Sequence, residues 1–518
     1  MSTWPKYPFI YEINTWVWLA GLSTTLRRTI DLSSVPSGEW DKIANLGFDA
    51  VWLMGVWERS PAGIAIANQN SNLLNDFRRA LQDFQPKDNV GSPYCVRRYV
   101  VDRVLGGPEG LAVARQELAK RGVRLILDWV PNHVAPDHPW ASDHPEYFIS
   151  GTEDDLRRDP SSYVAISGSI FACGRDPYFP AWPDVLQLNA FQSGLRKAVA
   201  ETVKSIADQC DGVRCDMAML VLNNIFQRTW GAKAGAMPGT EYWQELIPPT
   251  KAVHPDFIFI AEAYWDLEWE LQQKGFDFCY DKRLYDRVVH ENAASVRGHL
   301  NADLSYQGKL LRFIENHDEP RAAAEFIPGK DRVAAVLTAT LPGARLFYDG
   351  QFEGRKVRLP VFLSRLPEEP VNRNLQEFYE KLLTNLRGPL LRDGDWRLCQ
   401  CSGWPDNPSY QNLLAWCWEK GDERCLIVVN LSEGTVQGRV QVPWSDLANL
   451  QWALSDPLSG TEYARDGSEI FNPGLYVELG GWGYNCFIVQ RPGSKRQFNA
   501  DLSRETSITG RTGKTAAA

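Results

Sequence analysis

The hexapeptide Asp211-Gly-Val-Arg-Cys-Asp216 has the pattern of a short β-strand that ends on a charged pair. Because side chains alternate along a strand, Val213 and Cys215 are expected on one side, and Arg214 and Asp216 on the other. A guanidinium two residues before a carboxylate can hold that carboxylate ionised, as a nucleophile or a metal ligand requires. A purely structural ion pair is the alternative interpretation of the hexapeptide taken alone.

Three further apolar runs also end in polar clusters. They are Leu125-Ile-Leu-Asp-Trp-Val-Pro-Asn-His133, Phe257-Ile-Phe-Ile-Ala-Glu262 and Phe313-Ile-Glu-Asn-His-Asp318. Together with the first stretch they predict four parallel strands whose C-terminal ends meet at one pocket. The sequence therefore favours a functional interpretation of Arg214 and Asp216.

Strand and helix patterns alternate through most of the chain. This alternation predicts an α/β fold, a (β/α)8 TIM barrel formed by residues 1–133 and 186–392. The barrel is expected to be interrupted after its third strand by an irregular, loop-rich excursion over 134–185, where periodicity disappears. The region before Gly91 is also expected to be a polar loop.

The pattern changes beyond the predicted helix at 374–387. Short strand patterns separated by turn residues predict a C-terminal all-β sandwich domain over 393–491. The last segment, 492–518, is rich in Ser, Thr, Gly, Arg and Lys and has little to bury, which predicts a disordered tail.

Composition excludes several classes of protein. Hydrophobic residues at 44% and charged residues at 23% are typical of a soluble globular protein. A net charge of −9 argues against nucleic-acid binding, and no apolar run is long enough to span a membrane. Without a visible signal peptide, the ten scattered cysteines are expected to be reduced thiols in a cytoplasmic protein, here expected to be a monomer. The 20 tryptophans favour a carbohydrate ligand, since their faces can stack on sugar rings.

The polar strand ends resemble, in order and spacing, the four short motifs of the α-amylase family, glycoside hydrolase family 13. Asp128-Trp-Val-Pro-Asn-His133 resembles the first motif and Gly212-Val-Arg-Cys-Asp216 the second. Glu262 resembles the third and Glu315-Asn-His-Asp318 the fourth. The resemblance covers roughly residues 8–490, including the excursion and the C-terminal domain.

The resemblance implies three catalytic carboxyl groups. Asp216 would be the nucleophile that forms a glycosyl–enzyme intermediate with retention of configuration. Glu262 would protonate the leaving oxygen and then activate water, and its apolar strand fits a pKa that burial raises. Asp318 would bind sugar hydroxyls and help to distort the ring.

The same resemblance implies a set of substrate-binding residues. Arg214 would keep Asp216 ionised, and His133 and His317 would bind hydroxyls of the reacting sugar. Asp128, in the first motif, is placed in the same site. Tyr94 aligns with the family's stacking tyrosine. For the histidines, a local structural role is the alternative.

Several other residues and one further stretch near these motifs carry weaker signals. Arg98 stands where the family usually has an acidic residue. Trp182-Pro-Asp-Val-Leu-Gln-Leu-Asn189 resembles an additional family motif, although a proline turn before a strand explains it nearly as well. Trp57, Tyr264 and Trp265 are candidate sugar platforms, with core packing as the alternative.

No cofactor is expected to be required, although calcium is possible. Met219 and Leu220 stand where many family amylases have Lys-His, and the family's acidic calcium loop is absent after the first strand. Asn132 matches a usual calcium ligand. Further ligands would come from the acidic residues Asp154, Asp155 or Asp159.

The resemblance predicts a retaining hydrolase of α-amylase type that acts on α-glucans or maltooligosaccharides. A transglycosylase or isomerase of the same family, acting on α-glucans, sucrose or trehalose, is the near alternative, because loops rather than motifs distinguish them. A third possibility, which is not an enzyme, is a catalytically inactive carbohydrate-binding or interaction protein. The presence of Asp216, Glu262 and Asp318 argues against it.

Overall fold

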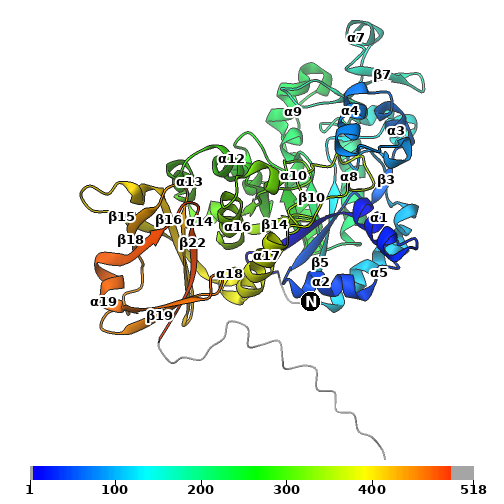
Figure 1. Ribbon diagram of the computed structural model, residues 1–518. Coiled ribbons are helices and arrows are strands. Elements are labelled where there is room, and N and C mark those ends of the chain that lie inside the picture. The colour runs from blue at the N-terminus through cyan, green and yellow to red at the C-terminus, as the bar shows by residue number, and fades with distance from the viewer. Residues whose placement is uncertain (1–3, 492–518) are drawn as a thin grey trace, which may run out of the picture.

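Eight parallel strands close into a barrel in the computed structural model, which describes residues 4–491 (Figure 1). The predicted (β/α)8 fold is therefore confirmed, and the predicted tail at 492–518 lies outside the described residues. Around the barrel the strand order is β1-β14-β13-β12-β11-β10-β5-β2. The bounds are β1 (Phe9–Asn14), β2 (Ala50–Met54), β5 (Arg124–Trp129), β10 (Gly212–Cys215), β11 (Ile258–Ala261), β12 (Phe278–Tyr280), β13 (Leu310–Arg312) and β14 (Ala344–Tyr348).

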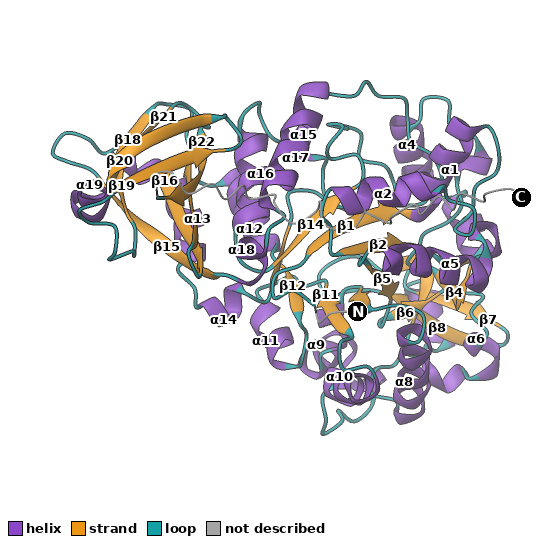
Figure 2. Ribbon diagram, turned by 90° about the horizontal axis from the view of Figure 1, so that it is seen from below, coloured by secondary structure: helices purple, strands orange, loops and turns teal. Residues whose placement is uncertain are grey.

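Helices surround these strands (Figure 2). Residues expected to begin and stabilise helices do so: Pro108 lies in the first turn of α5, and Leu195, Val199 and Val203 form the buried stripe of α8. The helices between and after the barrel strands are α1 (Thr15–Leu26), α2 (Ser37–Asn45), α5 (Gly107–Lys120), α8 (Ser193–Ala207), α9 (Asn223–Trp230), α10 (Tyr242–Val253), α11 (Glu268–Gln273), α12 (Lys282–His290), α13 (Ala293–Leu300), α14 (Leu304–Gln307), α15 (Ala322–Glu325), α16 (Lys330–Thr340), α17 (Arg373–Leu386) and α18 (Pro389–Asp393).

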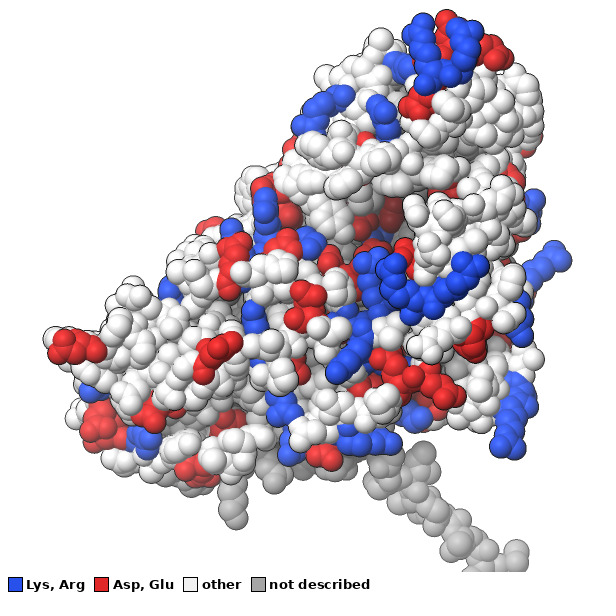
Figure 3. Space-filling view, turned by 45° about the horizontal axis from the view of Figure 1, so that its top comes forward, with Lys and Arg blue, Asp and Glu red and all other residues white. Residues whose placement is uncertain are grey.

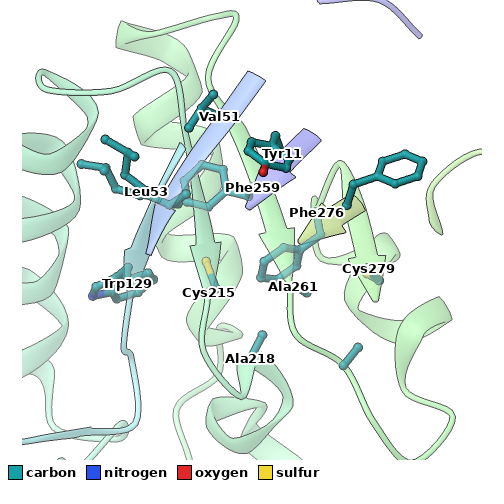
Figure 4. Packing of buried hydrophobic residues seen from close by; sticks show 14 of the residues in the cluster. Tyr11, Val51, Leu53, Trp129, Cys215, Ala218, Phe259, Ala261, Phe276 and Cys279 are labelled. Carbon is teal, nitrogen blue, oxygen red and sulfur yellow. The ribbon is translucent and has the colours of Figure 1, made fainter. Parts of the chain in front are cut away.

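Alternation along the strands sorts their side chains into two layers. Arg214 on β10 is in register with Asp128 on β5 and with Ile260 on β11, so these three side chains face the barrel interior. Val213 and Cys215 belong instead to the buried cluster between strands and helices, part of which Figure 4 shows. The alternation predicted for the Asp211–Asp216 stretch is confirmed, and it turns the charged residues inward.

The strand predicted to end at Asp318 is shorter than expected. Pairing of β13 stops at Arg312, and the Asn316 side chain then accepts hydrogen bonds from the backbone N–H groups of Asp318 and Glu319. These local hydrogen bonds stabilise a turn in place of further strand pairing. His317 and Asp318 therefore lie on a turn beyond the strand.

The region after β2, predicted to be a polar loop, is largely helical. It contains β3 (Trp57–Arg59), α3 (Pro61–Ala67), α4 (Ser71–Ala80) and β4 (Val96–Val101). The prediction was wrong for two reasons. The helix α3 has only seven residues, too few to show a period, and the apolar positions of α4, Leu73, Leu74 and Phe77, stand in a mostly polar segment. Ser60 caps α3, and the Asn70 side chain accepts two backbone hydrogen bonds at the start of α4.

The predicted excursion after β5 is present, and it is more regular than expected. It contains a four-stranded antiparallel sheet in the order β6-β9-β8-β7, with α6 (Trp140–Asp143) and α7 (Glu153–Arg158). The strands are short and one register shifts between Cys173 and Gly174, which hides their alternation in the sequence. Their bounds are β6 (His133–Val134), β7 (Tyr163–Ile166), β8 (Ser169–Gly174) and β9 (Trp182–Gln187).

The C-terminal domain is all-β, as predicted. Its eight strands form an antiparallel sheet in the order β20-β19-β22-β17-β16-β15-β18-β21, which encloses a core that includes Leu413, Leu426, Val440 and Val477. A short helix, α19 (Gly467–Glu469), follows β20. The bounds are β15 (Asp395–Ser402), β16 (Leu413–Lys420), β17 (Glu423–Asn430), β18 (Val436–Gln441), β19 (Gln451–Asp456), β20 (Thr461–Asp466), β21 (Leu475–Leu479) and β22 (Tyr484–Gln490).

The domain lies beside the barrel at the end where α16 and α18 are found (Figures 1 and 2). Trp416 and Trp418, both fully buried, point away from the domain's own core and belong to the barrel's outer hydrophobic cluster. Within residues 4–491, none of the helices combines the length and the apolar character that crossing a bilayer requires.

Candidate active site

Arg214 is the centre of a cluster of carboxylates at the C-terminal ends of the barrel strands. Its Nη1 atom lies 2.8 Å from Asp216 and its Nη2 atom 2.8 Å from Glu262. The same guanidinium lies 3.9 Å from Asp128 and 4.0 Å from Asp318. Because Arg214 is completely buried, these carboxylates supply the charge that its burial requires.

Glu262 follows β11 directly and has three hydrogen-bonding or ionic neighbours. Besides Arg214, the backbone N–H of Met217 donates at 2.6 Å and the Tyr264 hydroxyl at 2.9 Å. Met217 has a φ of 42°, a left-handed conformation that is strained for this residue type, and its N–H points to Glu262. Burial nevertheless raises the pKa of Glu262 to about 7.

Asp216 follows β10 and contacts the other terminal nitrogen of the same guanidinium. Burial raises the pKa of Asp216, but the Arg214 guanidinium opposes this shift through its charge and its hydrogen bond.

Asp318 lies beside the imidazole of His317. The His317 Nε2 atom is 2.8 Å from Asp318 and 2.6 Å from the Tyr94 hydroxyl, and the Nδ1 atom contacts the buried Glu12. Burial alone would raise the pKa of Asp318, but the adjacent His317 lowers it to about 2. Asp318 is thus held ionised, and its side chain is 43% exposed toward the cavity.

Asp128 lies behind this cluster. Its side chain is buried and accepts a hydrogen bond from the Gly55 backbone at 3.0 Å, while burial raises its pKa to about 6. It faces Arg214 and does not line the cavity. Trp57, a predicted sugar platform, is also buried, and its indole N–H donates to the Asp128 carbonyl at 2.7 Å. The prediction that Trp57 is a sugar platform is therefore wrong.

His133 belongs to the excursion sheet and lines the opposite side of the cavity. Its imidazole packs edge-to-face on Trp182, with ring centroids 5.3 Å apart, and burial lowers its pKa to about 4. Trp182 and Asp184 lie on β9, so the stretch that resembles an additional motif is brought to the site. Arg98 instead pairs with Glu58, away from the lining.

The cavity has a volume of about 390 Å³. It is lined by Ser92, Tyr94, His133, Trp182, Asp184, Val185, Asp216, Met217, Glu262, Tyr264, Asp318 and Phe362. The face of the molecule in Figure 3 is hollowed, with acidic side chains inside the hollow and basic side chains along part of its edge. The structure thus brings all the predicted catalytic and substrate-binding residues together, with Asp128, Arg214 and His317 behind those that line the cavity.

Three of the four candidate calcium ligands are held by contacts with other protein groups. The Asn132 side-chain oxygen accepts a hydrogen bond from Gln187 at 2.9 Å, and Asp155 pairs with Lys233 at 2.7 Å. Asp154 pairs with Arg157 on α7. Within residues 4–491, no group of three or more His, Cys, Asp or Glu side chains is placed to hold a metal ion.

Residues 37–359 match the family described as "Alpha amylase, catalytic domain", which is more than half of the chain. The chain belongs to the α-amylase family. The match includes β2 to β14 and every carboxylate of the cluster around Arg214.

Family relatives are distant and carry different activities in their names. "Alpha-amylase MalA" from Haloarcula japonica is 22% identical over 61% of this chain and 41% of the relative. "Alpha-1,4-glucan:maltose-1-phosphate maltosyltransferase" from Picrophilus torridus is 22% identical over 74% of this chain and 58% of the relative. The chain thus spans about half the length of these relatives.

Solved structures of the family share the fold along almost the whole chain. The maltogenic α-amylase AmyB from Thermotoga neapolitana matches with a TM-score of 0.65 and 16% identity, over 94% of this chain and 99% of that one. The debranching enzyme from Nostoc punctiforme matches with a TM-score of 0.63 and 19% identity, over 94% and 100%.

Sequence reasoning missed several residues of this α-amylase-family site. Glu12 contacts His317 across 305 positions of sequence, and Phe362 reaches the cavity from the segment between β14 and α17. A charged residue inside the apolar Phe9–Ile13 run was a signal for Glu12. For Phe362, an aromatic residue in a long loop, no local pattern existed.

Proposed function

We propose that the protein is a retaining glycoside hydrolase that cleaves α-glucosidic bonds of α-glucans or maltooligosaccharides. The observation that carries this proposal is the placement of Asp216 and Glu262 on the two ends of one guanidinium, facing one cavity. Glycoside hydrolysis uses two carboxyl groups that flank the scissile bond. Membership of the α-amylase family supports α-glucans as the substrate class.

In the first step, Asp216 attacks the anomeric carbon of the sugar. The bond between that carbon and the glycosidic oxygen breaks, and Glu262 transfers its proton to the departing oxygen. The products are a free hydroxyl on the leaving chain and a glycosyl ester on Asp216. Glu262 with a pKa of about 7 is still protonated at neutral pH in a substantial fraction of molecules, as this step requires.

In the second step, Glu262 acts as the base. Its carboxylate takes a proton from water, the water oxygen attacks the anomeric carbon, and the ester bond to Asp216 breaks. Both carboxyl groups return to their initial state. Two successive inversions at one carbon give a product with the α-configuration of the substrate.

The remaining cavity residues would bind the reacting sugar. Asp318 is a fixed anion that accepts hydrogen bonds from hydroxyls, held by the imidazole of His317. Tyr94 and His133 lie on the lining, where His133 contributes a neutral imidazole. Arg214 and Asp128 act behind them by fixing the charge of the carboxyl pair.

Retention requires carboxyl groups about 5–5.5 Å apart, whereas inverting enzymes separate them by about 6.5–9.5 Å. Asp216 and Glu262 each approach a terminal nitrogen of the same guanidinium at 2.8 Å, which favours the shorter separation. The bridging Arg214 is thus the physical support for retention.

Glycosyl transfer to another sugar is the second candidate. A neighbouring cavity of about 360 Å³ shares Met217 and Tyr264 with the first, and Phe179 and Trp265 give it apolar walls. A sugar held there could accept the glycosyl group in place of water. The maltosyltransferases among the relatives are named for such a transfer.

Glu262→Gln tests the assignment of the carboxyl groups. An activated α-glucosyl fluoride needs little protonation, so this variant should still glycosylate Asp216 but should not release the sugar. We expect a trapped adduct on Asp216 by peptide mass spectrometry, and azide, which needs no base, should release α-glucosyl azide. Asp216→Asn is the control and should give no adduct.

An adduct on a different residue, or a first product of wild type with the β-configuration, would contradict the proposal. A product profile on starch, maltooligosaccharides, sucrose and trehalose separates the two candidates. On starch and maltooligosaccharides, reducing ends that increase with time indicate hydrolysis, whereas longer oligosaccharides without new reducing ends indicate transfer. On sucrose and trehalose, free monosaccharides indicate hydrolysis and a new disaccharide indicates transfer.

A further inference from the structure

Two exposed aromatic side chains lie next to each other on the C-terminal domain. Trp404 is 40% exposed and Tyr476 is 43% exposed, whereas most other tryptophans of the domain, at 396, 416, 418, 444 and 452, are buried. The two ring centroids are 6.3 Å apart and the ring planes make an angle of 31°. This pair is separate from the cavity of the candidate active site, and neither side chain contributes to a hydrophobic core.

The aromatic pair is part of a polar strand face. On β21, Val477 and Leu479 point into the core while Tyr476 and Glu478 point outward. Glu478 is in register with Gln437 on β18, whose amide donates to it at 2.6 Å, and the Tyr476 hydroxyl donates to the same carboxylate at 3.0 Å. Aromatic surface and hydrogen-bonding groups therefore lie within one small area.

The segment that carries Trp404 is fixed in place. Asn407 donates its backbone N–H to the Trp404 carbonyl at 3.0 Å and its side-chain amide to the Gln437 carbonyl at 3.1 Å. At Gly403, an added Cβ would overlap the Tyr410 ring, so only glycine permits this close packing. A ring held in this way loses little conformational freedom when a ligand binds.

We propose that Trp404 and Tyr476, with Gln437 and Glu478, form a second carbohydrate site that binds an α-glucan chain away from the active site. The proposal rests on the proposed function for the class of glucan. The C–H faces of sugar rings stack on aromatic faces, and hydroxyls at the ring edge hydrogen-bond to amides and carboxylates. Two platforms tilted by 31° suit consecutive rings of a curved chain better than a flat ligand.

A protein partner fits this face less well. A stable protein interface buries about 800 Å² per partner around an apolar centre. Here two exposed rings lie beside polar side chains, since the neighbouring outward residues of β18 are Gln437, Arg439 and Gln441. The chemistry matches an amphipathic, hydroxyl-rich ligand.

Amide hydrogen exchange on the full chain with maltoheptaose tests the site directly. We expect protection of 403–410 and 475–479 in the wild type and its loss in the double variant Trp404→Ala/Tyr476→Ala. Protection around the active-site cavity should be equal in both proteins. The matched control is Trp269→Ala, which removes a 52% exposed tryptophan from the barrel and should leave both protected regions unchanged.

Kinetics gives the second measurement. The double variant should retain its kcat/KM on a short maltooligosaccharide but lose about tenfold in apparent affinity for soluble starch or glycogen. Absence of protection at 403–410, or equal binding of polymer by both proteins, would overturn the site. So would a wild-type dimer in sedimentation that the double variant loses, since a second copy would then cover the face. Exchange needs no turnover, so an inactive protein with protection at 403–410 would overturn the proposed function alone.

Discussion

Glu262 and Asp216 illustrate how single residues acquire different chemistry from one shared neighbour. Both contact Arg214 at 2.8 Å, and both are almost completely buried. Burial raises the pKa of Glu262 to about 7, and burial also raises the pKa of Asp216, where Arg214 opposes the shift through its charge and a hydrogen bond. Glu262 is therefore still partly protonated near neutral pH, as the role of an acid requires.

We expect a bell-shaped dependence of kcat/KM on pH. Activity needs protonated Glu262, so kcat/KM should fall as pH rises through about 7. It also needs ionised Asp216, so kcat/KM should fall again in acid. Asp318 has a pKa of about 2, so its ionisation should not change kcat/KM over the pH range in which Glu262 titrates. In Glu262→Gln, glycosylation by α-glucosyl fluoride should lose the alkaline limb, and persistence of that limb would contradict the assignment.

Glu12→Gln should weaken the charged network at His317. Burial alone would lower the pKa of His317, but Asp318 and Glu12 raise it well above its ordinary value. A raised folded-state pKa stabilises the protein fully below the unfolded value of about 6.5, and this stability is lost as pH rises through the folded value. Removing one partner of a buried ion pair costs about 3 kcal/mol.

Urea unfolding at several pH values measures this effect. The difference between wild type and Glu12→Gln should be largest near pH 6 and should shrink as pH rises through the folded-state pKa of His317. Imidazole titration by NMR should show a lower pKa for His317 in the variant. An unchanged His317 titration would mean that Glu12 has only a packing role.

The catalytic candidates could be predicted from sequence because each ends an apolar run. Asp216, Glu262 and the Asp318 cluster follow strands or runs whose alternation or composition is visible locally. Glu12 was missed because its partner His317 is 305 residues away, and Asp128 was expected to bind substrate because its burial behind Arg214 depends on the closed barrel. Local patterns identify strand ends, but only the tertiary fold decides which ends face a cavity.

At the scale of elements, the barrel strands were predictable and the excursions were not. A strand such as β11 is buried on both faces and reads as a continuous apolar run. The excursion strands β6 to β9 are short, partly exposed and irregular in register, so no period emerges. The helix α3 is short and capped by Ser60, and the apolar stripe of α4 is short and lies in a mostly polar segment.

The hydrogen bonds of Asn132, between β5 and the excursion, predict that activity and folding do not require calcium. Gln187 on β9 donates its amide to the Asn132 side chain at 2.9 Å and to the Asn132 carbonyl at 3.0 Å. The side-chain oxygen of Asn132, the atom that would bind calcium, therefore already accepts a hydrogen bond from the Gln187 amide. Treatment with a chelator followed by gel filtration should leave the activity and the thermal midpoint unchanged. Loss of activity that added calcium, but not magnesium, restores would contradict this prediction.

At the scale of the molecule, the barrel and the C-terminal domain share a hydrophobic cluster. Trp416, Ile427 and Val429 from the domain's sheet belong to the same buried cluster as residues of the barrel helices. The Trp418 indole N–H donates to the Thr340 carbonyl at the end of α16, at 2.7 Å. A continuous core across the junction implies that the two parts stabilise each other.

Trp418→Ala should therefore destabilise the whole chain and not the C-terminal domain alone. Trp418 is completely buried and packs edge-to-face on Tyr7 at 5.6 Å, with the Arg345 guanidinium 5.6 Å from its ring. Truncation leaves a cavity at the junction and an unpaired carbonyl at Thr340, which lowers the free energy of unfolding by about 3–5 kcal/mol.

Since the junction joins both parts, wild type and variant should each unfold in one transition, with coincident curves from tryptophan fluorescence and far-ultraviolet circular dichroism. Trp404→Ala, at an exposed position of the same domain, is the matched control and should change the free energy of unfolding by no more than about 0.5 kcal/mol. Two separate transitions in the wild type, or a Trp418→Ala variant as stable as Trp404→Ala, would show that the domains fold independently and that the shared cluster contributes little.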